Sequence, residues 1–392
     1  MTTTLVLFFI VIFLFIIFRK EKFVTNNVLL GMAIFPAIFI SLNEYILKGV
    51  LDSSIAGEDF TFPQRYAKFF IYMLCFLVLP SILFFTKFKY QHFFNIILIS
   101  ILISIGFNTY TNIHLNFDRD MLAQTLSPVI HYDYGVVALS LLLMCYGFYL
   151  KGMRSYVITL IAIINILLIV LHGSRGAWLG LPIAFLMIFI FYWHHNIRKI
   201  LIFSLLPLVL IILSLVLIPS SPIQKRLDAF NYDKDKIINN SNYNSSIGSR
   251  LLLWGNALHE FEKSPLTGVG MVKLKQSNCL LYESKKVLDC FTHAHNVYLQ
   301  TLAAHGLLGL SAILFLFFAP IIFFIQEIRN KRNRKIYFLS TSGIIFISYI
   351  MICSLTDLYF MIKGTTMLYY LVVFTLISLI LKEGSNDNKI TS

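Results

Sequence analysis

The sequence predicts an all-α protein, a polytopic bundle of about 11 to 12 transmembrane helices with one large external loop that contains short helices. Of 392 residues, 58% are hydrophobic and only 13% are charged, about half the charge of a typical soluble domain. Apolar runs of roughly 17–22 residues recur along nearly the whole chain, and this length crosses a bilayer as a helix. Basic residues gather in short clusters between these runs, as in cytoplasmic loops.

The hydropathy pattern places the spans at residues 3–18, 25–42, 67–86, 93–108, 134–150, 155–172, 177–193, 200–219, 306–326, 336–353 and 367–381. The first apolar run has no basic segment before it and is followed by RKEK, so we expect a retained span rather than a cleaved signal peptide. With the amino terminus outside, alternation of the spans puts every basic cluster in the cytoplasm. These clusters are Arg19–Lys22, Lys87–Lys89, Lys151–Arg154, Arg198–Lys199 and Arg329–Lys335.

Four regions follow along the chain. Residues 1–219 form transmembrane helices 1–8, residues 220–305 a large periplasmic loop with interfacial helices, residues 306–381 the C-terminal transmembrane helices, and residues 382–392 a disordered cytoplasmic tail. From residue 220 to residue 294 the chain has ten Lys and Arg against seven Asp and Glu. Long external segments translocate regardless of charge, so this excess fits the topology and indicates an anionic partner on the outer face. Nucleic acid is not an expected partner, whereas membrane lipids are.

The ordered part of this loop begins with Ser249–Lys263, where apolar residues at three- and four-residue spacing predict an amphipathic helix. Ser249 is the expected cap of that helix. SPLTGVG at 264–270 then predicts a tight turn. Cys279 and Cys290 can form a disulfide in an oxidising periplasm, although spacing alone does not establish the pairing.

Two arginines are candidate functional residues. Arg175 lies in a very short connection between two spans, which holds its guanidinium near the outer membrane surface; the alternative is a side chain that only snorkels to the head groups. Arg250 follows the expected cap, in the first helical turn, where a cation opposes the helix dipole. A guanidinium beside a helix amino terminus binds phosphate well, and the alternative is a solvated surface arginine.

The third candidate is His295, in a polar approach to the ninth span. Imidazole accepts a proton near neutral pH, so His295 is a candidate base, and the alternative is a histidine that only caps its helix. Gly306 and Gly309 are expected to act as a hinge between an interfacial helix and the span. His293 and His305 do not complete a convincing zinc site, so we expect no metal. Asp357, at the outer end of a span, is expected to pair with Lys363 or to orient a catalytic group.

These residues lie in motifs that resemble the bacterial O-antigen ligases, within the wider O-antigen ligase and polymerase family. The shared features are SRGAWL at 174–179, SR…W at 249–254 followed by KSPLTGVG, and HNVYLQTLAAHGLLG at 295–309. The third fits a pattern of His-Asn, nine residues and Gly-x-x-Gly. The resemblance covers roughly residues 155–326. The family commonly has twelve spans, one more than predicted here.

The resemblance implies a glycosyltransferase of lipopolysaccharide biosynthesis, a multi-pass protein of the bacterial inner membrane with its site facing the periplasm. It would transfer O-antigen polysaccharide from undecaprenyl diphosphate to a sugar hydroxyl of lipid A–core, by inverting displacement and without a metal or cofactor. Arg175, Arg250 and His295 would be catalytic, and Asn296 and Trp254 would join the two arginines in binding substrate. The alternatives are an O-antigen polymerase with the same donor and, outside enzymes, a transporter of lipid-linked glycans. ATP-driven chemistry is not expected, because the chain has no Walker loop.

Overall fold

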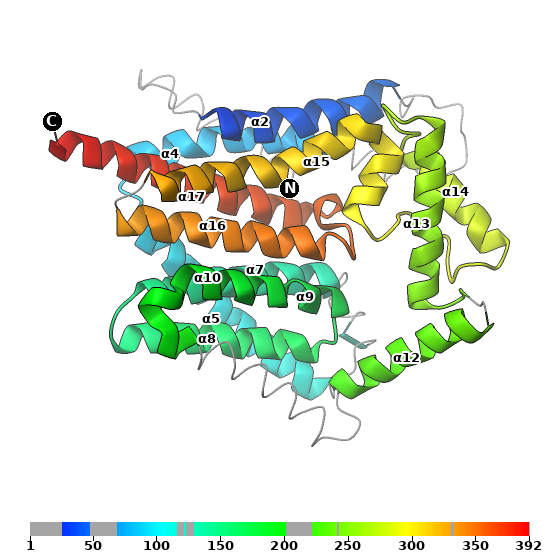
Figure 1. The fold of residues 1–392 in the computed structure, drawn as a ribbon, viewed down its shortest axis with the longest axis horizontal. Coiled ribbons are helices and arrows are strands. Elements are labelled where there is room, and N and C mark those ends of the chain that lie inside the picture. Colours follow the sequence, from blue (N-terminus) through cyan, green and yellow to red (C-terminus); the bar gives the residue numbers. More distant parts are fainter. Residues whose placement is uncertain are drawn as a thin grey trace. The chain divides into compact units, whose positions relative to one another are not determined.

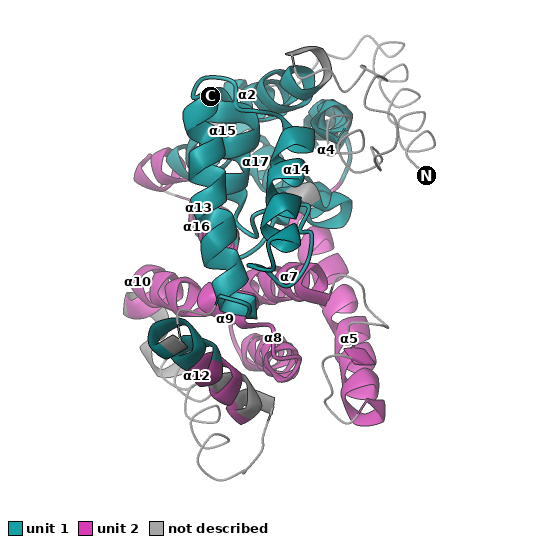
Figure 2. Ribbon diagram, turned by 90° about the vertical axis from the view of Figure 1, so that its right-hand side faces the viewer, with its two compact units in different colours: residues 1–87, 233–323, 354–392 teal, residues 88–232, 324–353 magenta. Residues whose placement is uncertain are grey.

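The computed structural model describes residues 26–47, 69–115, 121–122, 129–200, 222–240, 243–330 and 333–391. Within these ranges the chain is helical and has no strand (Figure 1). The helices divide into two compact units (Figure 2). Unit 1 comprises residues 1–87, 233–323 and 354–392, and unit 2 comprises residues 88–232 and 324–353.

Nine of the eleven predicted spans correspond to helices in the described part of the chain. Eight are long and apolar enough to cross a membrane, and Phe69–Phe85 is a shorter apolar helix. The eight are Asn27–Glu44, Tyr90–His114, Val129–Tyr149, Met153–Leu171, Arg175–Trp193, Val297–Arg329, Arg334–Cys353 and Lys363–Ser385. The predicted spans 3–18 and 200–219 lie outside the described residues, apart from residue 200. The protein is therefore a multi-pass, all-α membrane protein.

Unit 2 is built around α7 (Val129–Tyr149), most of whose residues are buried. It packs against α8 (Met153–Leu171) and α16 (Arg334–Cys353), while α8 also contacts α5 (Tyr90–His114). Polar side chains hold three of these helices together: Asn108 of α5, Tyr132 of α7 and Asn165 of α8 belong to one buried hydrogen-bond network. Such interhelical hydrogen bonds satisfy polar groups where lipid offers no partner.

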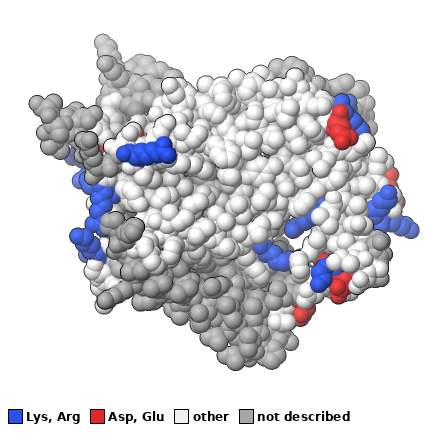
Figure 3. All heavy atoms as spheres, in the orientation of Figure 1, with Lys and Arg blue, Asp and Glu red and all other residues white. Residues whose placement is uncertain are grey.

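The outer side of α5 has the composition of a lipid-facing surface. Only a third of its most apolar window is buried. Its exposed large side chains are Ile96, Ile99, Leu102, Ile103, Phe107, Tyr110 and Ile113. Figure 3 shows the same pattern more widely, because the visible sides of the spanning helices are almost free of charge and Lys and Arg gather near helix ends. An apolar side and charged ends are what a bilayer requires.

In unit 1 the long helices are α2 (Asn27–Pro36) with its π-helical continuation η1 (Ala37–Leu47), α15 (Val297–Arg329, which ends in unit 2) and α17 (Lys363–Thr391). The 3-10 segment η2 (Leu74–Val78) and α4 (Leu79–Phe85) pack against α17. Gly31 lets α2 approach α15, since a Cβ there would lie 2.6 Å from the Phe315 ring. The hydroxyl of Tyr370 in α17 donates to the Met32 carbonyl of α2 at 2.7 Å.

The loop that was predicted to be external, residues 220–305, is largely helical in its described part. It contains α12 (Pro222–Asn240), α13 (Ser246–Lys263) and α14 (Met271–Glu283), and Figure 1 shows α13 running crosswise past one end of α15. No helix was predicted from the sequence in the polar, Asn-rich segment that forms α12. Within this helix Gln224 Nε2 donates to Asp228 Oδ1 one turn later, at 3.1 Å.

Two expected boundaries were wrong. Helix α13 begins at Ser246 and is capped by Ser245, whose hydroxyl accepts from the Gly248 amide at 3.1 Å; the predicted cap, Ser249, instead accepts from the Leu288 amide at 3.2 Å. The C-terminal segment 382–392 is helical to Thr391 as a continuation of α17, where a disordered tail was expected. The ammonium of Lys382 supports that continuation by donating to the Leu83 carbonyl of α4 at 2.9 Å.

Candidate functional site

The hinge predicted at Gly306 is a break in α15. Gly306 has φ 65° and ψ −160°, so the helix stops and restarts there. A Cβ on Gly306 would lie 2.4 Å from the Leu266 carbonyl carbon, and one on Gly268 would lie 2.3 Å from that of Ala304. Both positions therefore require glycine, because the backbone has a positive φ and the turn at 264–270 is in direct contact with the break.

Four backbone hydrogen bonds join that turn to the broken helix. The amides of Val269 and Gly270 donate to the carbonyls of Ala303 and Ala304, both at 2.9 Å. In the other direction, the amides of Leu307 and Leu308 donate to the carbonyls of Pro265 and Leu266, at 2.9 and 3.2 Å. The turn thus satisfies the backbone polar groups that the break in the helix would otherwise leave without hydrogen-bond partners.

A buried ion pair lies beside this junction. Glu44 of η1 and His305 are both fully buried, with Glu44 Oε2 3.5 Å from His305 Nδ1. The Glu44 carboxylate also accepts from the Met271 amide, at 3.0 Å. Asn43 Nδ2 donates to the Thr267 carbonyl at 3.0 Å. The end of the second predicted span thereby holds the start of α14, and the sequence signal was an acid at the end of an apolar run.

His295 precedes the first half of α15 and has a left-handed backbone conformation, with φ 49°. This conformation is uncommon for a residue other than glycine, and such strain gathers at functional sites. The neighbouring backbone is fixed from three directions. The indole of Trp254 donates to the Ala294 carbonyl at 2.9 Å, the Ala294 amide donates to the Gln300 side chain at 2.8 Å, and the Val297 amide donates to the Ser354 carbonyl at 2.9 Å.

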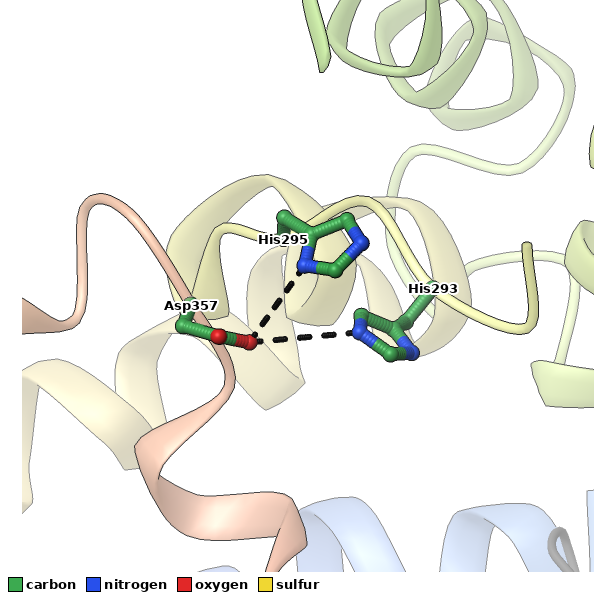
Figure 4. A group of neighbouring side chains, drawn as sticks. All are labelled: His293, His295 and Asp357. Atoms are coloured by element: carbon green, nitrogen blue, oxygen red, sulfur yellow. Dashed lines mark ion pairs between the residues drawn. The ribbon is translucent and has the colours of Figure 1, made fainter. Parts of the chain in front are cut away.

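The structure places Asp357 beside His295. Its Oδ1 lies 3.5 Å from His295 Nδ1 and 3.9 Å from His293 Nε2. Figure 4 shows both imidazoles turned toward this carboxylate, with the second ring nitrogen of His295 directed away from it. The side chain of Asp357 is 6% exposed and that of His295 is 19% exposed. The candidate base is therefore partly accessible to a substrate, whereas its carboxylate partner is buried. Of the two roles expected for Asp357, this contact supports the orientation of a catalytic group.

Three ligand atoms here would suit a cation. One atom each of His293, His295 and Asp357 lie within 4.8 Å of one another, and two imidazoles with a carboxylate are a common donor set for transition metals. The sequence did not indicate this group, because Asp357 lies far from the two histidines along the chain and only the fold brings it beside them. His305 is not part of this group, because it pairs with Glu44.

The other sequence candidates of unit 1 lie around the same segment. Arg250 stands one helical turn before Trp254, on the α13 face that contacts residue 294. It is the fifth residue of α13, not part of the first turn, so the predicted combination of a guanidinium with a helix amino terminus was wrong. Asn296 caps α15, because its Oδ1 accepts from the amides of Tyr298 and Leu299 at 2.9 and 3.1 Å. Trp254 and Asn296 thus have structural contacts in addition to their predicted substrate contacts.

The loop disulfide is present. Cys279 and Cys290 are bonded, with a sequence separation of 11, which resolves the pairing that spacing had left open. The bond joins α14 to the segment that leads to His295. Asn278, next to Cys279, donates from Nδ2 to the Phe291 carbonyl at 3.2 Å and reinforces the same connection.

Arg175 belongs to unit 2, where it begins the short helix α9 (Arg175–Leu179), just before α10 (Leu181–Ile200). Two buried side chains of the preceding loop bind one carboxylate: His172 Nδ1 lies 2.7 Å from Asp133 Oδ1, and the Ser174 hydroxyl donates to Asp133 Oδ2. This buried triad fixes the backbone immediately before Arg175. Sequence reasoning missed it, although Ser174 is the first residue of the SRGAWL motif and His172 lies two residues before it.

Comparison with known proteins agrees with the motifs. The profile of the O-antigen ligase family matches residues 160–314. An uncharacterised protein of Haemophilus influenzae is 30% identical over 230 residues, which are 56% of this chain and 57% of that protein. The O-antigen ligase of Escherichia coli is 25% identical over 334 residues, which are 83% of this chain and 77% of that protein. The region that the profile matches contains Arg175, Arg250 and His295, and this part of the chain is similar to the O-antigen ligase family.

Proposed function

We propose that the protein transfers O-antigen polysaccharide from undecaprenyl diphosphate to a sugar hydroxyl of lipid A–core, at the periplasmic face of the inner membrane. The observation that carries this proposal is the pairing of His295 with Asp357, 3.5 Å apart. His295 has a left-handed backbone conformation and lies within the region that the family profile matches. A histidine with a carboxylate beside one ring nitrogen is suited to take a proton from a hydroxyl with the other.

The reaction is an inverting displacement. His295 takes the proton of the acceptor hydroxyl through its Nε2, and the hydroxyl oxygen attacks the anomeric carbon of the donor sugar. The bond between that carbon and the diphosphate oxygen breaks, and the lipid diphosphate leaves with the electron pair. Asp357 stabilises the imidazolium that forms, as a buried carboxylate does for a catalytic histidine.

Arg175 and Arg250 bind the diphosphate and stabilise the charge that develops on the leaving group. Guanidinium groups suit this role because they remain charged and form two parallel hydrogen bonds to phosphate oxygens. Their contribution grows as the glycosidic bond breaks, so they act mainly on the transition state. No metal is required in this scheme.

The test is transfer in vitro with purified protein, undecaprenyl-linked glycan and lipid A–core. We expect Arg175→Ala, Arg250→Ala and His295→Ala each to lower transfer by at least about a hundredfold while expression stays normal. Retention of near-normal transfer by His295→Ala would exclude its assignment as the base. Transfer that is lost with a chelator and restored by a divalent cation would replace the metal-free scheme with a cation held by His293, His295 and Asp357.

A cellular experiment separates this proposal from its main alternative. Loss of a ligase leaves bare core on the cell surface, whereas loss of an O-antigen polymerase leaves core bearing a single O-antigen unit. We expect bare core when the chain is deleted. If the chain were a transporter, its deletion would leave undecaprenyl-linked glycan on the cytoplasmic side of the membrane, and the purified protein would catalyse no transfer.

A further inference from the structure

A polar groove lies between α13 and α14 in unit 1. Its volume is about 820 Å³, within the range of binding sites for small ligands. Both walls are helices of the external loop, and α14 is tied down at its two ends by the Glu44 contact with the Met271 amide and by the Cys279–Cys290 disulfide. These contacts hold α14 in place, so the fold itself fixes this wall of the groove.

The floor of the groove is a closed polar network. The Ser277 hydroxyl lies 2.9 Å from Asn256 Oδ1 and 2.7 Å from Glu260 Oε1, and the Lys263 ammonium lies 2.6 Å from the same Glu260 oxygen. Glu260 is the one carboxylate among the described residues that line the groove, and Lys263 balances its charge. The lining keeps a net positive charge, from Lys273 and Lys286.

The remaining side chains match a particular chemistry. The amide of Gln276 and the hydroxyls of Ser264 and Ser284 suit sugar hydroxyls, and the leucines at 280 and 281 offer an apolar surface to a ring. Ammonium groups bind phosphate and carboxylate as point charges. We propose that this groove binds the anionic part of an oligosaccharide, a short sugar chain bearing phosphate or carboxylate groups.

A chain of contacts connects the groove to the candidate base. Asn256 on the floor donates from Nδ2 to Asn278 Oδ1 at 2.8 Å, and Asn278 donates to the Phe291 carbonyl, four residues before His295. A glycan held in the groove is thereby fixed relative to the segment that carries the base. The excess of basic residues in the external loop indicated an anionic partner on the outer face, and the groove assigns that partner to α13 and α14.

This inference rests on the proposed function for the source of the sugar chain. Two sources carry the same chemistry, namely the phosphorylated core of the acceptor and an acidic glycan on the donor. The test measures equilibrium binding of fluorescently labelled, delipidated oligosaccharides to the full-length protein in detergent micelles. The probes are phosphorylated core oligosaccharide, the same material after phosphatase treatment, and O-glycan released from its lipid.

The groove variant is Lys273→Glu with Lys286→Glu. The matched control is Lys275→Glu with Lys285→Glu, which makes the same change of charge at neighbouring positions outside the groove lining. We expect the groove variant to bind the anionic probe about tenfold more weakly or worse, and the control to stay within about twofold of the unmodified protein. Binding should also weaken at high salt, because the contacts are exposed.

The outcomes are distinguishable. Preference for phosphorylated core, or for an acidic O-glycan, supports the groove and identifies its source. Equal binding of all three probes, absence of binding to any of them, or equal losses in the two double variants overturns it. If a Glu variant melts early, Lys273→Gln with Lys286→Gln replaces it. If the protein transfers glycan normally but the groove variant binds the probes as well as the unmodified protein does, only this inference is overturned. If binding depends on the groove residues but the protein catalyses no transfer, only the proposed function is overturned.

Discussion

Replacement of Asp357 by Asn tests whether the carboxylate acts on His295. The substitution keeps the size of the side chain and one acceptor oxygen, removes the negative charge, and replaces the other oxygen by an amide nitrogen that donates. In the proposed reaction His295 becomes positive as it takes the hydroxyl proton, so the charge of Asp357 matters more in the transition state than before it. We expect kcat to fall, with little change in affinity for the donor.

The size of the effect follows from the separation of the two groups. Unit charges 3.5 Å apart attract one another by about 5 kcal/mol at an effective dielectric constant of about 20. His295 is partly exposed and Asn retains a dipole, so we take about half of this value, 2 to 3 kcal/mol. That corresponds to a roughly 30- to 150-fold slower transfer.

The assay is single-turnover transfer by the purified protein at saturating donor, with the thermal midpoint of each variant as a check on folding. Glu283→Gln is the control, because it neutralises an exposed acid at the end of α14. A rate for Asp357→Asn within threefold of the unmodified protein, at an unchanged melting midpoint, would refute the pairing as a catalytic contact.

Three further predictions concern stability, measured as melting midpoints of detergent-purified protein. Gly306→Ala should destabilise the protein by at least about 3 kcal/mol, because the strain of a positive φ and the clash of the new Cβ with the Leu266 backbone add. The control is Gly255→Ala, where a Cβ meets nothing within 4 Å, and it should be neutral or stabilising. Cys279→Ser should cost about 2–3 kcal/mol and should abolish the midpoint shift that a reductant causes in the unmodified protein. Glu44→Ala should cost about 3–5 kcal/mol, since it leaves His305 buried without its carboxylate, and an unchanged midpoint would show that the ion pair contributes nothing.

The spans and the break in α15 beside the site were predictable because both depend on the local pattern of residues. Bilayer thickness sets the length of an apolar run, and a helix cannot end in lipid without partners for its backbone. The break at Gly306 was likewise predictable, from two glycines between a polar approach and an apolar run. The cap of α13 was misplaced by four residues, because Ser245 and Ser249 are both acceptable caps. In the structure Ser245 caps the helix and Ser249 accepts from the Leu288 amide instead.

The pairings that define the site were not predictable from local pattern. Glu44 meets the Met271 amide across a separation of 227 residues, and Asp133 meets His172 and Ser174 across about 40. Asp357 was recognisable as an acid at a membrane boundary, but its distance from His295 depends on how the chain returns after α16. Periodicity says which face of a helix is apolar and gives no information about which distant polar group reaches it.

The turn inserted into the break of α15 has a consequence for the assembly of the protein. The turn at 264–270 is synthesised before α15. Its backbone amides and carbonyls therefore lack their hydrogen-bond partners until residues 303–308 have been made. The break, in turn, cannot settle at membrane depth before the turn has reached it. The turn between α13 and α14 therefore docks in the same step in which α15 inserts. In a chain that stops before α15 is complete, α13, the turn and α14 should remain accessible to protease.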